Sequence, residues 1–326
     1  MSFRKLNTQI YWPTSDQKVW GSNPYGRTSS IFNFKREGVF VTVLIIGGAS
    51  YTGYNFALKI CKKETTYSLI TNQSTASRVI EDLQANGVKI IDKFDPIIEG
   101  DVQNLNKVFY FGGYSCSDHK FKDLDGLVRA YSLGILQALE IGRIFNCKVF
   151  ICGSYWEIVE TNITGLSINL YAALQQSSNL LIDFYKKTFN TKVTKIYLAD
   201  TYGPSDWRPK LLSNLISPNA STHELSMGSG KQVIGPMYID DVTDQLEEIA
   251  YCDKEIDGIQ LIPIKIYTLE EYLREIEDLL DTKLKIKWGS RISERQEINV
   301  FPQLKAGTLM SKSKTTLKEG INFILG

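Results

Sequence analysis

A buried strand that runs into a glycine-rich turn and then a helix is the feature that most constrains this chain. Val41–Ile46 is a β-branched run of the kind buried in a parallel sheet. The turn Gly47-Gly48-Ala49-Ser50-Tyr51-Thr52-Gly53 follows, and the residues from Gly53 to Lys63 have a helical pattern. Since neighbouring parallel strands are joined by a crossover helix, this unit predicts an α/β fold.

The same alternation of strand and helix patterns continues to about residue 205. We predict further strands at 67–71, 88–91, 107–111, 148–152 and 193–198, and helices at 77–86, 127–145 and 169–189. The pattern favours a Rossmann-type doubly wound parallel sheet over residues 41–205. Residues 206–326 are predicted to form mainly a smaller, substrate-binding C-terminal lobe, with segments that return to the first domain. Within this lobe, a helix at 269–280 is indicated by the capping-box pair Thr268 and Glu271.

The first 40 residues differ from the rest, because they show no sustained period of 2 or 3.6. We interpret them as an N-terminal appendage. It could cover an edge of the fold or cap a partner subunit. A third hypothesis is that translation begins at Val41, after codons for Arg36-Glu37-Gly38 that resemble a ribosome-binding site.

Composition excludes several classes of protein. A formal net charge of +1 gives no field for nucleic acid or an anionic membrane, and no apolar run approaches the ~20 residues that span a bilayer. Five scattered cysteines favour reduced thiols, and two histidines outside any motif favour neither a metal site nor a Ser-His-Asp triad. A cytoplasmic protein without a metal is the expectation.

The glycine-rich turn indicates a dinucleotide site. Residues without bulk let backbone N–H groups at a helix N-terminus approach a pyrophosphate. Gly47 would make the tight turn and Gly53 the close helix contact, while Ser50 stands where a third glycine is usual and Tyr51 and Thr52 open the helix. A glycine turn without a ligand is the alternative interpretation.

The end of the second strand bears on the choice of cofactor. An NAD-binding protein usually has a carboxylate there for the ribose hydroxyls. The residues that follow this strand include Asn72 and Ser74 but no acid, with Arg78 shortly after. We therefore predict NADP in preference to NAD, with Ser74 and Arg78 near the 2′-phosphate and Asn72 as a further cofactor-binding residue. Arg78 is equally well explained as a solvated helix residue.

Ser154, just past the fifth strand, and Tyr171, on the following helix, resemble the serine and tyrosine of the short-chain dehydrogenase/reductase family. The resemblance implies that Tyr171 is the general acid/base and that Ser154 hydrogen-bonds the same substrate oxygen. In that family a lysine one helical turn after the tyrosine lowers its pKa and holds the nicotinamide ribose. Here Gln175 occupies that position.

Further matches resemble the extended branch of that family, the NAD-dependent epimerase/dehydratase group that acts on nucleotide sugars. They are Tyr202-Gly203-Pro204-Ser205-Asp206 and Tyr238-Ile239-Asp240-Asp241-Val242. The short interval between Ser154 and Tyr171 is most similar to the deoxysugar reductases that form CDP-abequose and CDP-paratose.

This resemblance implies further binding residues. Phe111, Gly112, Gly113 and Leu198 would line the cofactor with Tyr171 and Gln175. Tyr155, Trp156, Arg208 and Arg295 would bind a nucleoside-diphosphate sugar. Analogy with the group suggests a homodimer formed through two long helices.

The residues that depart from the family pattern favour some activities of the family over others. Glutamine supplies no charge, so we expect a smaller fraction of Tyr171 to be phenolate. An enzyme that uses Tyr171 as a proton donor is affected less by this than one that uses it as a proton acceptor. Reduction of a 4-keto-deoxyhexose therefore comes first and 4-epimerisation second. A 4,6-dehydratase is disfavoured because Tyr155-Trp156 stands where its acid/base pair belongs. Tyr131, where the family often has asparagine, is a further departure. The missing lysine, Ser50, and Ile234-Gly235 where the family commonly has an arginine also keep open a catalytically silent cofactor-binding protein.

Overall fold

The computed structural model describes most of the chain from Val41 to Gly326. The described residues are 41–70, 77–93, 97, 102–114, 116, 118–159, 167–216, 224–290, 297–304, 307–310 and 312–326. The predicted N-terminal appendage lies outside them.

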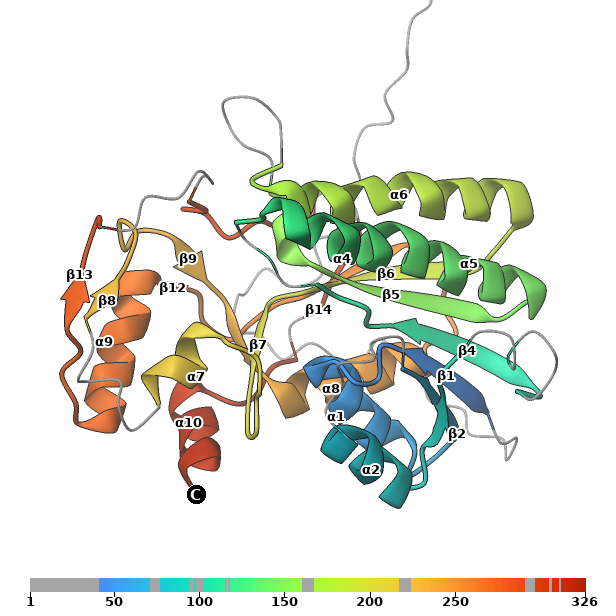
Figure 1. Ribbon diagram of the computed structural model, residues 1–326, viewed down its shortest axis with the longest axis horizontal. Helices are drawn as coiled ribbons and strands as arrows, with labels where there is room; N and C mark the ends of the chain where they lie inside the picture. Colours follow the sequence, from blue (N-terminus) through green and yellow to red (C-terminus); the bar gives the residue numbers. More distant parts are fainter. Residues whose placement is uncertain are drawn as a thin grey trace, which may run out of the picture. The chain divides into compact units, whose positions relative to one another are not determined.

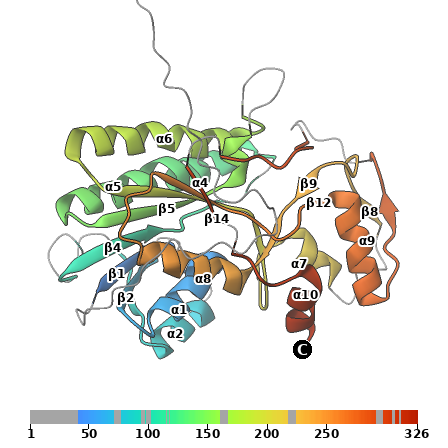
Figure 2. The ribbon, with the colours of Figure 1, turned by 180° about the vertical axis from the view of Figure 1, so that it is seen from behind.

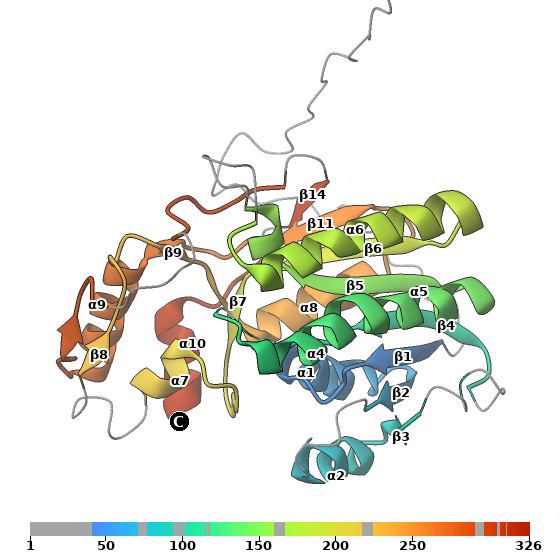
Figure 3. The same ribbon diagram turned by 45° about the horizontal axis from the view of Figure 1, so that its top comes forward.

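An all-parallel sheet forms the centre of the described chain, as the sequence predicts. Within the described residues it has eight strands, in the order β14-β11-β6-β5-β4-β1-β2-β3 (Figure 3). Their bounds are β1 Thr42–Ile46, β2 Thr65–Leu69, β3 Lys89–Ile91, β4 Leu105–Tyr110, β5 Lys148–Ser154, β6 Val193–Leu198, β11 Gly258–Leu261 and β14 Thr308–Met310. Strands β11 and β14 come from the last third of the chain, so that part contributes to the sheet.

The order of the strands reverses between β1 and β4. From β1 the chain adds β2 and β3 on one side, and then crosses to the other side of β1 with β4. At such a switch point the loops after the two strands diverge to opposite faces, which leaves a crevice at the carboxyl ends. Gly47 and Phe111 are the first residues beyond these two strands.

Helices cover both faces of the sheet (Figures 1 and 2). One face carries α1 (Tyr51–Ile60), α2 (Ser77–Ala85) and α8 (Ile239–Ala250), and the other carries α4 (Leu124–Val128), α5 (Gly134–Ile144) and α6 (Leu170–Phe189). One hydrophobic core lies between the sheet and the second group, where aliphatic strand residues such as Leu44, Val108 and Val149 are fully buried. None of the helices in the described ranges has both the length and the apolar character needed to span a bilayer.

The helical run before β5 is not the single regular helix that the sequence predicts for 127–145. Arg129–Leu133 forms a π-helical turn, η2, between α4 and α5, after the short 3₁₀ turn η1 (Phe121–Asp123). Such insertions are frequent at functional sites, because they re-aim one side chain without ending the helix. The re-aimed region here contains Tyr131.

A second, smaller group of elements surrounds its own core. These elements are β7 Asp200–Tyr202, α7 Leu211–Leu215, β8 Leu225–Ser226, β9 Val233–Ile234, β10 Pro236–Tyr238, β12 Tyr267–Thr268, α9 Leu269–Leu280, β13 Ile286–Lys287 and α10 Leu317–Leu325. The strands pair as β7 with β10, β9 with β12 and β8 with β13. Leu212, Leu273 and Ile321 are among the residues of this core. Helix α9 has the predicted bounds and the predicted capping box of Thr268 and Glu271.

Asp241 connects the two groups of elements through backbone hydrogen bonds. Its buried carboxylate lies in the first turn of α8, and Oδ2 accepts hydrogen bonds from the N–H groups of Lys314 (2.9 Å) and Thr315 (2.8 Å). These residues lead into α10. Asp241 is therefore a structural connection between α8 and the segment that leads into α10.

We expect Asp241→Ala to lower the free energy of unfolding by about 2 kcal/mol, because two backbone donors lose a charged acceptor. Asp240→Ala is the matched control, since Asp240 is exposed in the same helical turn and shares the same helix dipole. Urea unfolding of both variants measures the difference, and equal losses would contradict the assigned role.

Candidate active site

Gly47 brings the two loops of the switch point into backbone contact. Its φ of +83° lies in the left-handed region. A Cβ at this position would lie 2.7 Å from the nitrogen of Gly112 and 2.8 Å from the carbonyl carbon of Phe111. Both atoms are backbone, so no side chain could move aside, and only glycine permits the approach.

The next residues leave the N-terminus of α1 open to an anion. Ser50 is the N-cap, with extended backbone, and its Oγ accepts a hydrogen bond from the N–H of Gly53 (3.2 Å). A Cβ on Gly53 would lie 2.4 Å from the carbonyl oxygen of Gly47, which explains the second glycine of the turn. The N–H groups of Tyr51 and Thr52 have no intrahelical acceptor and point out of the helix start. Such a terminus attracts phosphate.

Two of the residues predicted to bind the cofactor have buried side chains. The Tyr51 hydroxyl donates to the carbonyl oxygen of Pro204 (3.0 Å), and its ring lies beneath the Arg208 guanidinium at 4.5 Å. Phe111 packs against Phe56 and Phe109 in the core. Only the backbone of Tyr51 and Phe111 is therefore available at the crevice.

The other predicted cofactor residues are spread around the crevice. Gly112 and Gly113 follow β4, Leu198 ends β6 on a cavity wall, and Arg78 is exposed on α2. Asn72 and Ser74 lie outside the described residues, so their roles stay predictions.

Ser154, Tyr171 and Gln175 come together as the motif predicts. Ser154 is the last residue of β5 and the N-cap of the 3₁₀ turn η3 (Tyr155–Ile158), where its Oγ accepts from the N–H of Trp156 (3.2 Å). Tyr171 is in the first turn of α6, which Asn169 caps. One turn later the Gln175 amide donates to the Tyr171 hydroxyl at 3.0 Å.

The environment of Tyr171 favours the protonated phenol. Burial raises the pKa of Tyr171 above its ordinary value of 10.0. Hydrogen bonding with Ser154, Gln175 and Tyr131 acts in the opposite direction, while the carboxylate of Glu157 raises the pKa further. At neutral pH Tyr171 is therefore a neutral hydroxyl that can give up a proton.

Aromatic rings fix the orientation of Tyr171. Tyr131 and Trp156 meet its ring edge-on, with centroids at 5.2 Å and 6.0 Å. The Tyr131 hydroxyl accepts from the N–H of Tyr114 (2.9 Å) and donates to its carbonyl oxygen (3.1 Å). Thus Tyr131, which departs from the family pattern, joins the π-helical turn to the site.

A cavity of about 700 Å³ connects these residues. Thr52, Ser154, Trp156 and Tyr171 line one part of it, and residues of the smaller group of elements, including Lys210, line another. Its size suits a ligand larger than a single sugar. Tyr155 also reaches the cavity, but it is buried, with its hydroxyl bonded to Asp200 (2.8 Å) and its ring stacked on Phe301.

The cations of the cavity differ in how they are engaged. Arg208 makes two hydrogen bonds to the Asp206 carboxylate and one to the Thr201 carbonyl oxygen. The ammonium of Lys210 has no hydrogen bond or ion pair within the described residues, and burial, followed by the charge of Arg208, lowers the pKa of Lys210. Sequence reasoning missed Lys210, because a lone lysine after a loop motif carries no distinguishing pattern. Arg295 lies outside the described residues.

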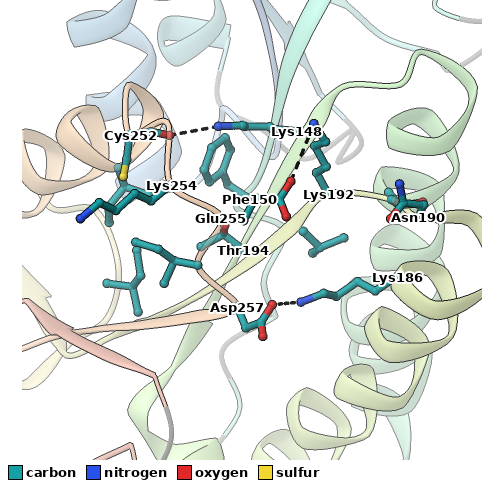
Figure 4. A pocket seen from close by; sticks show the side chains of 15 residues that line it. Lys148, Phe150, Lys186, Asn190, Lys192, Thr194, Cys252, Lys254, Glu255 and Asp257 are labelled. Atoms are coloured by element: carbon teal, nitrogen blue, oxygen red, sulfur yellow. Dashed lines mark hydrogen bonds and ion pairs between the residues drawn. The ribbon is translucent and has the colours of Figure 1, made fainter. Parts of the chain in front are cut away.

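A second cavity, of about 100 Å³, is less suited to an anion although lysines line it (Figure 4). Lys186 pairs with Asp257, Lys192 lies 3.8 Å from Glu255, and Lys148 donates to the Cys252 carbonyl oxygen at 3.0 Å. These three cations are already engaged.

Comparison with known proteins assigns the family. A family model described as the NAD dependent epimerase/dehydratase family matches residues 43–249. The chain belongs to this family. It is also similar to the CDP-abequose synthase of Yersinia pseudotuberculosis, with 24% identity over 76% of this chain and 87% of that protein.

Solved structures of two nucleotide-sugar epimerases share the fold. The UDP-glucuronic acid 4-epimerase of Bacillus cereus, in complex with UDP-4-deoxy-4-fluoro-glucuronic acid and NAD, superimposes with a TM-score of 0.72. It is 15% identical and covers 87% of this chain and 99% of its own. The UDP-glucose 4-epimerase of Thermotoga maritima, with UDP-glucose, gives a TM-score of 0.70 at 14% identity, over 87% and 97% of the two chains.

The residues present fit the dinucleotide that this family uses. At Gly47 the loops after β1 and β4 are in backbone contact that a Cβ would disrupt, and the start of α1 beside it presents N–H groups without an intrahelical acceptor. Both features face the crevice of the switch point.

We expect Gly47→Ala to raise the Kd for NADH about tenfold or more, because the loop must move away from the position of the phosphates. Gly87→Ala is the matched control, since Gly87 has a φ of +87° but no atom within 4 Å of a Cβ. Both variants carry the strain of left-handed backbone, so calorimetric titration isolates the contact. Equal affinity in the two variants would contradict it.

Proposed function

We propose that this protein is a reductase that transfers hydride from a nicotinamide cofactor to the keto carbon of a nucleoside-diphosphate 4-keto-deoxyhexose. The observation that carries the proposal is the neutral hydroxyl of the half-buried Tyr171, which receives a hydrogen bond from Gln175 at the wall of the large cavity. The bound nicotinamide would supply the hydride.

The residues around the carbonyl take complementary roles. Tyr171 donates its proton to the oxygen as negative charge develops there, and Ser154 hydrogen-bonds the same oxygen. Gln175 holds the Tyr171 hydroxyl in place, and its amide would hydrogen-bond the nicotinamide ribose. Solvent then returns a proton to the tyrosine.

The protonation state of Tyr171 supports reduction over epimerisation. An epimerase begins by removing a proton from a sugar hydroxyl, which requires a phenolate. The raised pKa of Tyr171, together with an uncharged residue at position 175, disfavours that state. A reductase uses the state that already predominates.

The residues after Ser154 support the same choice over dehydration. A 4,6-dehydratase needs an acid and a base that face the sugar. Tyr155 is engaged by Asp200, and Glu157 has a fully buried carboxylate that accepts from the N–H of Ser154 (2.8 Å).

We assign the sugar nucleotide to the part of the cavity formed by the smaller group of elements. Lys210, which has no ion pair among the described residues, provides a cation for the diphosphate, and Trp156 provides an aromatic edge beside Tyr171. Arg208 acts by fixing the loop that precedes Lys210, and Arg295 remains a predicted second contact.

The preferred cofactor within this proposal is NADPH. The absence of an acidic residue among Thr71, Asn72, Gln73 and Ser74 favours it. The family description and the Bacillus cereus complex concern NAD, so parallel titration with NADH and NADPH is the direct comparison.

We expect Tyr171→Phe to lower kcat by about 10²- to 10⁴-fold, because the proton donor is removed, with little change in the Kd for the cofactor. The assay follows cofactor oxidation at fixed pH with CDP-, dTDP- or UDP-4-keto-6-deoxyglucose. Tyr185→Phe, on the same helix but bonded to Glu140, is the control. Unchanged turnover in Tyr171→Phe would overturn the assignment.

We expect Lys210→Met to raise the KM for the sugar nucleotide about 10- to 100-fold, because a charge-assisted contact to phosphate is lost. Its kcat should stay near that of the unsubstituted protein. Lys187→Met is the control, since Lys187 is 79% exposed on α6. A fall in kcat at constant KM would place Lys210 near the reacting atoms instead.

A further inference from the structure

A buried ion pair lies directly behind the proposed catalytic residues. The Lys195 ammonium, on β6, is 3.1 Å from Oε2 of Glu157, in η3, and the two side chains are 3% and 0% exposed. This carboxylate oxygen has no hydrogen-bond partner among the described residues, so the charge of Lys195 alone compensates it. Burying two charges carries a large desolvation penalty, and a hydrophobic pair would often be as stable.

The pair connects both halves of the site. On one side, Oε1 of Glu157 accepts from the N–H of Ser154 at 2.8 Å. On the other side, Lys195 donates to the Ser178 hydroxyl (2.9 Å), which donates to the carbonyl oxygen of Gln175 (2.6 Å). The end of β5 and the first two turns of α6 are thereby tied to one charge pair.

The side chains of Glu157, Lys195 and Gln175 meet beside Gly153. A Cβ built there would lie 2.0 Å from Oε1 of Glu157, 2.8 Å from Cε of Lys195 and 3.1 Å from Oε1 of Gln175. The buried lysine from β6 therefore lies beside the side chain of residue 175, and the missing side chain of Gly153 leaves room for all three.

We propose that the Glu157–Lys195 pair positions Ser154 and Tyr171, and that the Lys195 ammonium from strand β6 occupies the buried space into which a lysine at position 175 would extend. Its catalytic part rests on the proposed function. In this arrangement Gln175 is neutral because the ammonium beside it is already present. A lysine at position 175 would bring a second cation into a space that holds one carboxylate.

The first experiment neutralises the pair without leaving a buried charge. We expect Glu157→Gln with Lys195→Met to unfold at a melting temperature near or above that of the unsubstituted protein, because both charges are removed together. The new glutamine at position 157 still accepts a hydrogen bond from the N–H of Ser154, but the hydrogen bond from Lys195 to the Ser178 hydroxyl is lost. Because α6 then loses this connection to β6, Tyr171 is held less firmly and kcat should fall about 10²-fold. The Kd for NADPH should change less than about twofold, since the Gly47 region is untouched. A stable double variant with full kcat would overturn the positioning role.

The second experiment moves the cation from the strand to the helix. Gln175→Lys alone should lower the melting temperature by about 8 °C or more, because two ammonium groups share one carboxylate. Gln175→Lys combined with Lys195→Met should recover both the melting temperature and kcat relative to either single variant. Lys187→Met in place of Lys195→Met is the control, because it removes an exposed lysine of α6. A combined variant no better than its parents would overturn the relocation of charge.

The two readouts separate this inference from the proposed function. If no protein in the series oxidises cofactor with any of the three 4-keto sugars, the proposed function fails. The melting temperatures then still decide whether Lys195 and residue 175 share one cation position. Recovery in the combined variant supports the shared position, and absence of recovery refutes it.

Discussion

The contact between Gly47 and the backbone at Phe111–Gly112 is the constraint on which the site depends. It lies where the order of strands reverses, and it holds the loops after β1 and β4 closer together than any side chain would allow. That approach opens the start of α1 to an anion and directs the crevice toward β5 and β6. Ser154 is the last residue of β5, and Tyr171 lies in the first turn of α6, the next long helix. Both residues therefore line the same cavity.

The protonation state of Tyr171 determines which direction of hydride transfer the site favours. Burial keeps its hydroxyl protonated, and Gln175 orients this hydroxyl without adding charge. A site of this kind is suited to completing a reduction rather than to beginning an oxidation. In our proposal the Glu157–Lys195 ion pair, buried behind these residues, holds Ser154 and Tyr171 in position. The hydrogen bond that orients the Tyr171 hydroxyl thus comes from α6, whereas the buried charges come from η3 and β6.

Sequence reasoning succeeded where local geometry depends on residues close together in the chain. The strand–turn–helix unit, the N-cap at α9 and the spacing of Tyr171 and Gln175 are local patterns with a single geometric meaning. It missed what depends on contacts distant in the chain. Lys195 is one residue of an otherwise ordinary strand, and only folding brings it to Glu157 and Gln175. The π-helical turn at Tyr131 likewise has no local signature, since the surrounding sequence fits a regular helix.

The most direct test follows the hydrogen atom itself. The protein is incubated with NADH or NADPH deuterated at the transferred C4 position and with CDP-, dTDP- or UDP-4-keto-6-deoxyglucose, and the sugar product is analysed by mass spectrometry and NMR. We predict that one of these pairings gives a sugar with one deuterium at C4 for each molecule of cofactor oxidised. If the cofactor stays reduced and the sugar unlabelled in every pairing, hydride transfer at Tyr171 is contradicted.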